Sequence, residues 1–139
     1  MIENWIVPCN TNIVRKNDTV IWKNSFTIKK GDNVYIYLSL PYGEIKFHCT
    51  VISDSVSNEL LNKNQYAVVK EPSNNYFAKK IKYIQLKKVV EYTDCILTFK
   101  KLRKFGLNQV QIQSRADRRL KAFIEDTEKR IMGGGTQNG

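Results

Sequence analysis

The chain has 139 residues, 42% of them hydrophobic and 11% aromatic, and its 23 Lys and Arg against 13 Asp and Glu give a formal charge of +10. This length suits one domain with a single core, and the composition excludes wholesale disorder. No apolar run approaches the roughly 20 residues of a bilayer-spanning helix, and the first residues lack the pattern of a signal peptide, so we expect an intracellular, cytoplasmic protein. The cysteines, Cys9, Cys49 and Cys95, form neither a disulfide framework nor a paired zinc motif.

Strand patterns dominate the first two thirds of the chain. We predict a short strand over Asn4–Pro8 with Trp5 and Val7 on one face, then a turn at 10–12 and one helical turn over 13–17. A Gly31-Asp32 turn leads into a strand over Asn33–Ser39, which alternates at a period of two. A turn at 41–43 then favours a hairpin with a strand whose one face carries Ile45, Phe47, Cys49 and Val51.

The next region is rich in Asn, Ser and Lys. Residues 54–78 look like an excursion from the sheet, with a short helix near 59–62. The strand that follows, Lys80–Tyr92, is expected to bury Ile84, Leu86, Val90 and Tyr92 on one face.

Two helices are predicted to close the chain. Thr98 caps the first, which ends at Gly106, and Ser114 caps the second with Asp117 three residues on. An amphipathic stripe then follows at Ala116, Leu120, Phe123, Ile124 and Ile131. The sequence thus predicts one domain over residues 1–132, and residues 133–139, which are rich in glycine, are expected to be a flexible tail or a truncated linker.

The positive charge is concentrated late in the chain. Residues 1–78 carry 8 basic and 7 acidic side chains, residues 79–99 carry 5 and 2, and residues 100–139 carry 10 and 4, so nine of the ten surplus charges (+3 and +6) follow residue 78. A one-sided positive field attracts polyanions, and nucleic acid is the usual partner. The alternative is a lysine-rich surface typical of an AT-rich genome.

Signatures of catalysis are scarce. His48 is the single histidine and is expected to be solvent-facing or structural, and the acidic residues of the first half do not form the set that a two-metal nuclease requires. A Cys₃His metal site is conceivable, but small buried thiols are commoner. No Gly-rich loop precedes a helix. We therefore expect no catalytic residues, no metal and no cofactor.

Three segments are informative together: WIVPCN at 5–10, WKNSFTIKKGDNVYIYLS at 22–39 and VQIQSRADRRLKAFI at 110–124. Their pattern resembles the EVE domains of the PUA-like superfamily, most closely the modules attached to modification-dependent restriction proteins, and the likeness extends from Trp5 to about Ile124. It implies an α+β fold: a small, twisted PUA-like β-barrel of about five to six strands with short helices and a C-terminal amphipathic helix. The connection between residues 10 and 22 is shorter than in the longer EVE pattern.

The resemblance implies that a modified base, flipped out of the helix stack, enters a pocket at one end of the barrel. Aromatic faces can stack on such a base, and amide or hydroxyl groups can read its polar edge. The residues carried over to this pocket are Trp22, Asn24, Ser25, Tyr37, Ser39, Trp5 and Asn10. Phosphate contacts are expected from Gln113, Arg115, Arg118, Arg119, Lys79, Lys80 and Lys82. The alternative for each aromatic residue is that it only packs in the core or covers the sheet. The alternative for each arginine of the helix is that it only faces the solvent.

The leading hypothesis is a non-catalytic module that binds double-stranded DNA and reads a modified base, 5-methylcytosine or hydroxymethylcytosine. It would target a restriction-type protein whose nuclease lies on a fused or partner domain. One rival is an RNA-binding PUA-like module, and the other is a standalone enzyme that modifies nucleic acid.

Overall fold

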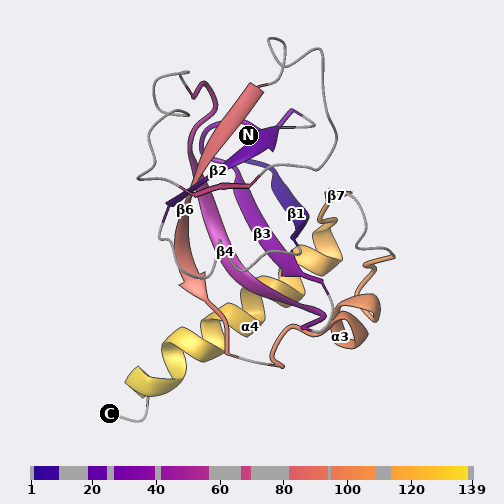
Figure 1. Ribbon diagram of the computed structural model, residues 1–139. Helices are drawn as coiled ribbons and strands as arrows, with labels where there is room; N and C mark the ends of the chain where they lie inside the picture. The colour runs from indigo at the N-terminus through magenta and orange to yellow at the C-terminus, as the bar shows by residue number, and fades with distance from the viewer. Residues whose placement is uncertain are drawn as a thin grey trace.

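A single mixed sheet organises the chain (Figure 1). The computed structural model describes residues 2–9, 19–24, 27–39, 42–56, 67–69, 82–93, 95–108 and 114–137. Over these ranges seven strands pair in the order β5-β2-β6-β4-β3-β1-β7. They are β1 (Asn4–Cys9), β2 (Thr19–Asn24), β3 (Asn33–Leu38), β4 (Glu44–Ser53), β5 (Ala67–Val69), β6 (Lys82–Glu91) and β7 (Ser114–Arg115).

The predicted hairpin of β3 and β4 is confirmed, and it forms the centre of the sheet. β1 pairs with β3 in parallel, and β2 pairs with β5 in parallel, whereas the other neighbours are antiparallel. Three strands were not expected, and one of them is β7, which contains the predicted helix cap Ser114. β2 carries Trp22 in a segment that was assigned to no element, and β5 lies inside the stretch predicted to be an excursion.

Both faces of the sheet are buried. On one face the strands enclose an inner cluster that contains Trp5, Val34, Phe47 and Leu86. On the other face an outer cluster packs Ile6 and Tyr35 against Leu120 and Ile124 of the last helix. Alternation along β1 and β3 sends successive side chains to the two clusters, as predicted for Trp5, Val7 and Ile6.

Bulges interrupt this alternation in β4 and β6. Ile36 pairs with Phe47 but Tyr37 pairs with Ile45, which leaves Lys46 as the extra residue in β4. In β6 the extra residue is Val89, because His48 pairs with Val90 and Cys49 with Lys88. Each bulge moves the residues beyond it to the other face. The prediction of a single face was therefore wrong for Ile45 in β4, and it was wrong for Val90 and Tyr92, which belong to the outer cluster while Ile84 and Leu86 belong to the inner one.

Two helices follow the sheet. In α3 (Phe99–Arg103) the Thr98 side chain accepts a hydrogen bond from Lys101 N, which confirms the predicted cap. Gly106 has a φ of 109°, a conformation that favours glycine, where the chain turns away from this helix. α4 (Arg118–Gln137) lies diagonally across one face of the sheet (Figure 1). It runs to Gln137, beyond the domain boundary predicted at residue 132.

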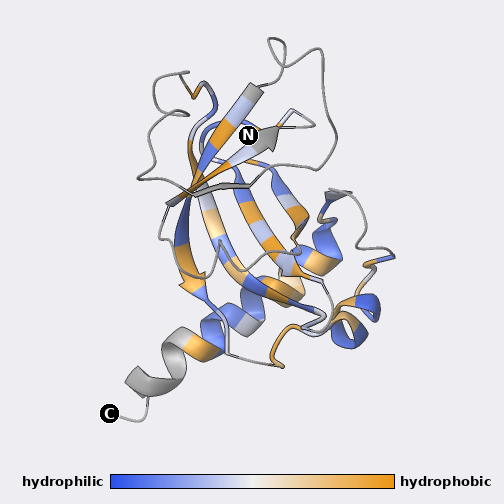
Figure 2. Ribbon diagram, viewed as in Figure 1, coloured by the Kyte–Doolittle hydropathy of each residue, from blue (hydrophilic) through white to orange (hydrophobic). Residues whose placement is uncertain are grey.

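The predicted start of the last helix was wrong. Ser114 lies in β7 and pairs with Ile6, whereas the helix begins at Arg118. Asp117 caps it, because its Oδ1 accepts a hydrogen bond from Leu120 N at 2.9 Å. Along α4, hydrophilic and hydrophobic stretches alternate, as expected of a helix with one face on a sheet (Figure 2).

The predicted α+β class is confirmed, and the twisted sheet carries its helices at the C-terminal end of the chain. The sheet is not closed into a complete barrel by the described strands, since its edges are β5 and β7. No helix in the described ranges has the length and apolar character needed to cross a membrane. The predicted turn at 10–12, helical turn at 13–17 and helix near 59–62 lie outside the described residues.

Candidate functional site

Trp5 is fixed on two sides. Its indole Nε1 donates a hydrogen bond of 3.0 Å to Oδ2 of Asp32, which is itself only 3% exposed. The guanidinium of Arg115, on β7, lies 5.1 Å from the centre of the indole ring, a cation–π distance. Asp32 also accepts hydrogen bonds from the backbone N–H groups of Glu3 and Lys29. The Gly31-Asp32 turn therefore anchors Trp5, and the indole N–H of Trp5 is engaged in a hydrogen bond inside the protein.

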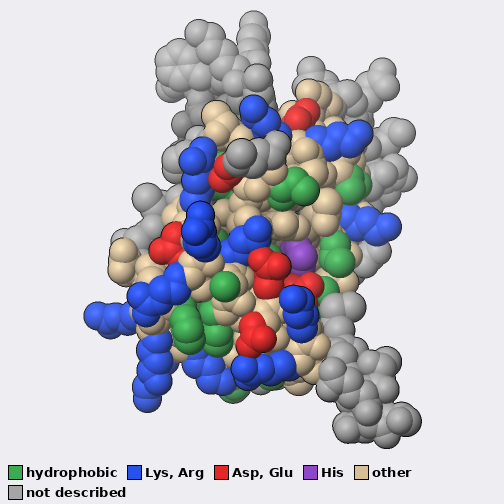
Figure 3. Space-filling model, turned by 180° about the vertical axis from the view of Figure 1, so that it is seen from behind, with side chains coloured by type: hydrophobic (Ala, Val, Ile, Leu, Met, Phe, Trp, Pro, Cys, Tyr) green, Lys and Arg blue, Asp and Glu red, His purple; other side chains and the backbone are tan. Residues whose placement is uncertain are grey.

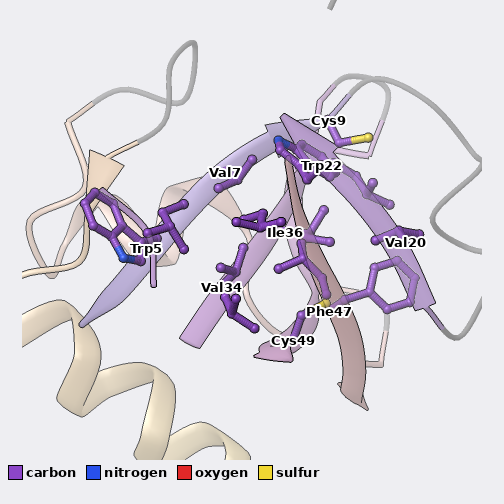
Figure 4. Close-up of a cluster of buried hydrophobic side chains, with 14 residues drawn as sticks. Trp5, Val7, Cys9, Val20, Trp22, Val34, Ile36, Phe47 and Cys49 are labelled. Carbon is purple, nitrogen blue, oxygen red and sulfur yellow. The ribbon is translucent and has the colours of Figure 1, made fainter. Parts of the chain in front are cut away.

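Trp22 belongs to the same inner cluster and is 7% exposed. It pairs with Ile84 of β6 and Val69 of β5, so its strand is flanked on both sides. Figure 4 shows the two indoles apart, with Trp5 at one end of this cluster, Val7 between them, and Val20 and Phe47 beyond Trp22. The structure therefore does not bring the two tryptophans together as walls of one aromatic cage.

Tyr37 lies on the other face of the sheet. It is 4% exposed and meets Phe99 of α3 edge-on, with ring centres 6.4 Å apart. Burial first, and then the charge of Glu44, raise the pKa of its hydroxyl above the usual value. The structure thus places Tyr37 with the helices and away from Trp22.

The polar pocket residues are only partly described. Ser39 is half-buried, and its backbone N–H donates to the carbonyl of Cys9 at 2.9 Å, which ties the ends of β1 and β3 together. Asn24 is the last residue of β2, and its side chain is not described. Asn10 and Ser25 lie outside the described residues.

Three of the predicted phosphate contacts are exposed arginines at the start of the last helix and in β7. Arg115 forms a loose ion pair with Glu3 at 3.8 Å, and Arg119 donates from Nη2 to the carbonyl oxygen of Lys104. Arg118 pairs with no acidic side chain in the part of the chain that the structure describes. Lys82 begins β6 with an undescribed side chain, and Gln113, Lys79 and Lys80 lie outside the described residues.

Sequence reasoning missed a network that joins α4 to the sheet. His48 Nδ1 lies 3.1 Å from both carboxylate oxygens of Glu128, and because a carboxylate only accepts, this nitrogen donates. Nε2 of the same ring lies 2.8 Å from Oδ1 of Asn33, and the imidazole stacks on Tyr35 at 4.7 Å. His48 is thus structural and largely buried, one of the two roles expected of it.

Tyr92 completes this network by donating its hydroxyl to Glu128 Oε2 at 2.7 Å. Burial and the bonded carboxylate raise its pKa well above the usual value, and burial raises that of Tyr35 as well. Both phenols therefore stay protonated at neutral pH. The contacts of the network lie within the protein and join α4 to β3, β4 and the end of β6.

Sequence reasoning also passed over the basic side chains of α3. Lys100, Lys101, Arg103 and Lys104 are all exposed. The signal was present in the sequence as four basic residues among the five at positions 100–104, but none of them was assigned a role. No group of three His, Cys, Asp or Glu side chains converges as metal ligands within the described ranges.

Comparison with known proteins identifies the architecture. No family model matches the sequence, and no curated protein matches it. Among solved structures, ASCH from Zymomonas mobilis superposes with a TM-score of 0.62 at 9% identity, over 89% of this chain and 94% of its own. Human THYN1 in complex with DNA that contains 5-methylcytosine superposes with a TM-score of 0.60 at 10% identity, over 91% and 98%.

A hypothetical protein from Leishmania major is also similar, with a TM-score of 0.60 at 14% identity over 94% of this chain and 98% of its own. Identities this low show a shared fold and no more. The chain therefore has the PUA-like fold that the resemblance implied.

Proposed function

We propose that this chain is a non-catalytic nucleic-acid-binding module of the EVE type that reads a modified base in double-stranded DNA. The base is 5-methylcytosine or hydroxymethylcytosine, and it is flipped out of the duplex into a recess beside β2. The module targets a restriction-type protein whose nuclease lies on a fused or partner domain.

The observation that carries this proposal is the fold shared with human THYN1, which is bound to 5-methylcytosine DNA in its own structure. The charge distribution is a second support, because nine of the ten surplus positive charges follow residue 78. Phosphate neutralisation by such a surface releases counterions and supplies salt-dependent affinity. That affinity offsets the few kcal/mol that flipping a base costs.

The burial of the aromatic residues shapes the proposed recess. Because Trp22 is 7% exposed, it forms part of the wall and does not project into the solvent. Trp5 and Tyr37, both committed to internal contacts, support the scaffold. The polar edge of the base is read by Asn10, Asn24, Ser25 and Ser39, and the phosphates are contacted by Gln113, Arg115, Arg118, Arg119, Lys79, Lys80 and Lys82.

Fluorescence anisotropy with four matched duplexes tests the proposal: unmodified DNA, DNA with one 5-methylcytosine, DNA with one hydroxymethylcytosine, and RNA of the same sequence. Burying one methyl group contributes about 0.8 kcal/mol, so we expect modified DNA to bind at least about fourfold more tightly than unmodified DNA. Equal affinity for all DNA duplexes would refute the reading of a modified base. Tighter binding of RNA would instead support an RNA-binding module.

A substitution at Trp22 separates recognition from folding. Trp22→Phe keeps an aromatic ring in the core, whereas Trp22→Ala opens a large cavity. We expect Trp22→Phe to reduce the preference for modified DNA and to leave binding to unmodified DNA unchanged. Equal losses on both duplexes would mean that Trp22 only supports the fold.

A further inference from the structure

Six exposed basic residues meet where the two helices approach each other. We call this surface the α3–α4 corner: Lys100, Lys101, Arg103, Lys104, Arg118 and Arg119. The segment 95–108 contains no acidic residue at all. In Figure 3 basic side chains gather on the side of the molecule where α3 lies.

The two halves of the corner are held together by direct contacts. Arg119 donates to the carbonyl oxygen of Lys104, so the start of α4 touches the end of α3. Phe105 and Phe123 stack in parallel beside this contact, with ring centres 4.0 Å apart and planes inclined by 5°. The basic side chains therefore project from one rigid unit.

Acidic residues close to the corner are engaged elsewhere. Asp117 caps α4, and Glu44 is 5% exposed and accepts a hydrogen bond from Cys95 N. Glu125 pairs with Lys121. None of the six basic residues forms an ion pair with an acidic side chain in the described ranges.

Other basic residues of the same region are balanced. Arg130 pairs with Asp126 at 2.7 Å, and Arg115 pairs with Glu3. Arg130 and Arg115 are therefore partly neutralised by acidic partners, which the six residues of the corner lack among the described acidic side chains.

The dimensions also suit a polyanion. Five helical residues span about 7.5 Å, which is less than the Debye length of about 8 Å at physiological salt, so the charges of α3 act together. Duplex DNA carries one negative charge for every 1.7 Å or so of its axis. From these observations we propose that the α3–α4 corner is the main phosphate-docking surface of the protein, with α3 as its centre. This inference rests on the proposed function and specifies where the DNA backbone lies.

The test compares two double variants that remove equal charge. Lys100→Gln with Arg103→Gln changes exposed residues on α3, and Lys129→Gln with Arg130→Gln changes exposed residues near the middle of α4. Binding of the 5-methylcytosine duplex is measured between about 50 and 200 mM salt, where each phosphate contact contributes about 0.9 to the slope of log K against log salt. We expect the α3 variant to lower the slope by about two and the control to lower it by less than half as much.

The outcomes separate this inference from the proposed function. If both variants lower the slope equally, or if the α3 variant leaves it unchanged, the corner is not the docking surface although the protein binds DNA. If the unsubstituted protein binds no duplex, the proposed function itself fails. Because both pairs of residues are exposed, we expect the two variants to have equal urea midpoints. If the α3 variant has a lowered midpoint, the measurement is repeated with Lys100→Met and Arg103→Lys. This pair removes one charge and should lower the slope by about one.

Discussion

Asp32 connects the Gly31-Asp32 turn to strand β1. The sequence predicted the Gly-Asp turn but not the partners of the carboxylate, because Glu3 and Trp5 lie 29 and 27 positions away and only the folded sheet brings them close. His48 shows the same limit, since its partner Glu128 is 80 positions distant. Local pattern identifies the backbone conformation of such residues, but long-range contacts determine their role.

Asp32→Asn is expected to destabilise the protein. The three hydrogen bonds to Asp32 come from N–H donors, and an asparagine would turn its own NH₂ group towards at least one of them. Hydrogen bonds to a charged group are worth about 1.5–3 kcal/mol, so we expect a loss of this order in the free energy of unfolding, measured by urea denaturation.

Asp54→Asn is the matched control. Asp54 also accepts a hydrogen bond from a backbone N–H, that of Lys30, but at the surface, where water can replace it. We expect a change of less than about 0.5 kcal/mol. A similar loss for both variants would contradict the role assigned to Asp32.

The elements themselves were predicted more successfully than the faces they bury. The strands at 4–8, 33–39 and 80–92 and the helix after Thr98 follow from alternation and capping, which are local. The bulges at Lys46 and Val89 could not be predicted, because they depend on pairing between strands, and they redistribute Ile45, Val90 and Tyr92 between the two clusters. The start of α4 was misassigned because Ser114 and Asp117 are both good caps, and pairing of Ser114 with Ile6 decides between them.

Capping of α4 can be measured directly. Asp117→Ala removes the acceptor of the Leu120 N–H group, and we expect a loss of about 1 kcal/mol in the free energy of unfolding. Ser114→Ala, which alters a half-buried residue in a two-residue strand, should cost clearly less. Asp117→Asn serves as the control, because asparagine caps helices about as well as aspartate. A larger loss for Ser114→Ala would restore the cap predicted from sequence.

At the scale of the whole molecule, the sequence predicted the fold and the excess of charge but not the arrangement of the site. Composition reveals how many basic residues there are, whereas the α3–α4 corner depends on the contact between Arg119 and Lys104. The aromatic pocket was implied by the resemblance to EVE domains, which placed Trp5, Trp22 and Tyr37 around one base. In the fold, Tyr37 and Trp22 belong to clusters on opposite faces of the sheet, and Val7 lies between Trp22 and Trp5 in the inner cluster.

Buried titratable groups make the whole fold sensitive to alkaline pH. Burial raises the pKa of Cys49 to about 12 and raises those of Tyr35, Tyr37 and Tyr92. In the unfolded chain these groups ionise near pH 8.5 for cysteine and near pH 10 for tyrosine. Between the unfolded and the folded pKa the native state binds more protons, so stability is full below about pH 8 and falls as the pH rises.

Each such group contributes a slope of up to about 1.4 kcal/mol per pH unit, and urea denaturation in reducing buffer at pH 7, 9 and 10.5 measures the sum. Tyr92→Phe should lower stability at pH 7, because the hydrogen bond to Glu128 is lost, and should reduce the further loss between pH 9 and 10.5. The difference between the alkaline slopes of the two proteins isolates the contribution of Tyr92, because the titration of surface lysines is common to both and cancels. An unchanged alkaline slope in Tyr92→Phe would show that the fold does not hold the phenol of Tyr92 protonated.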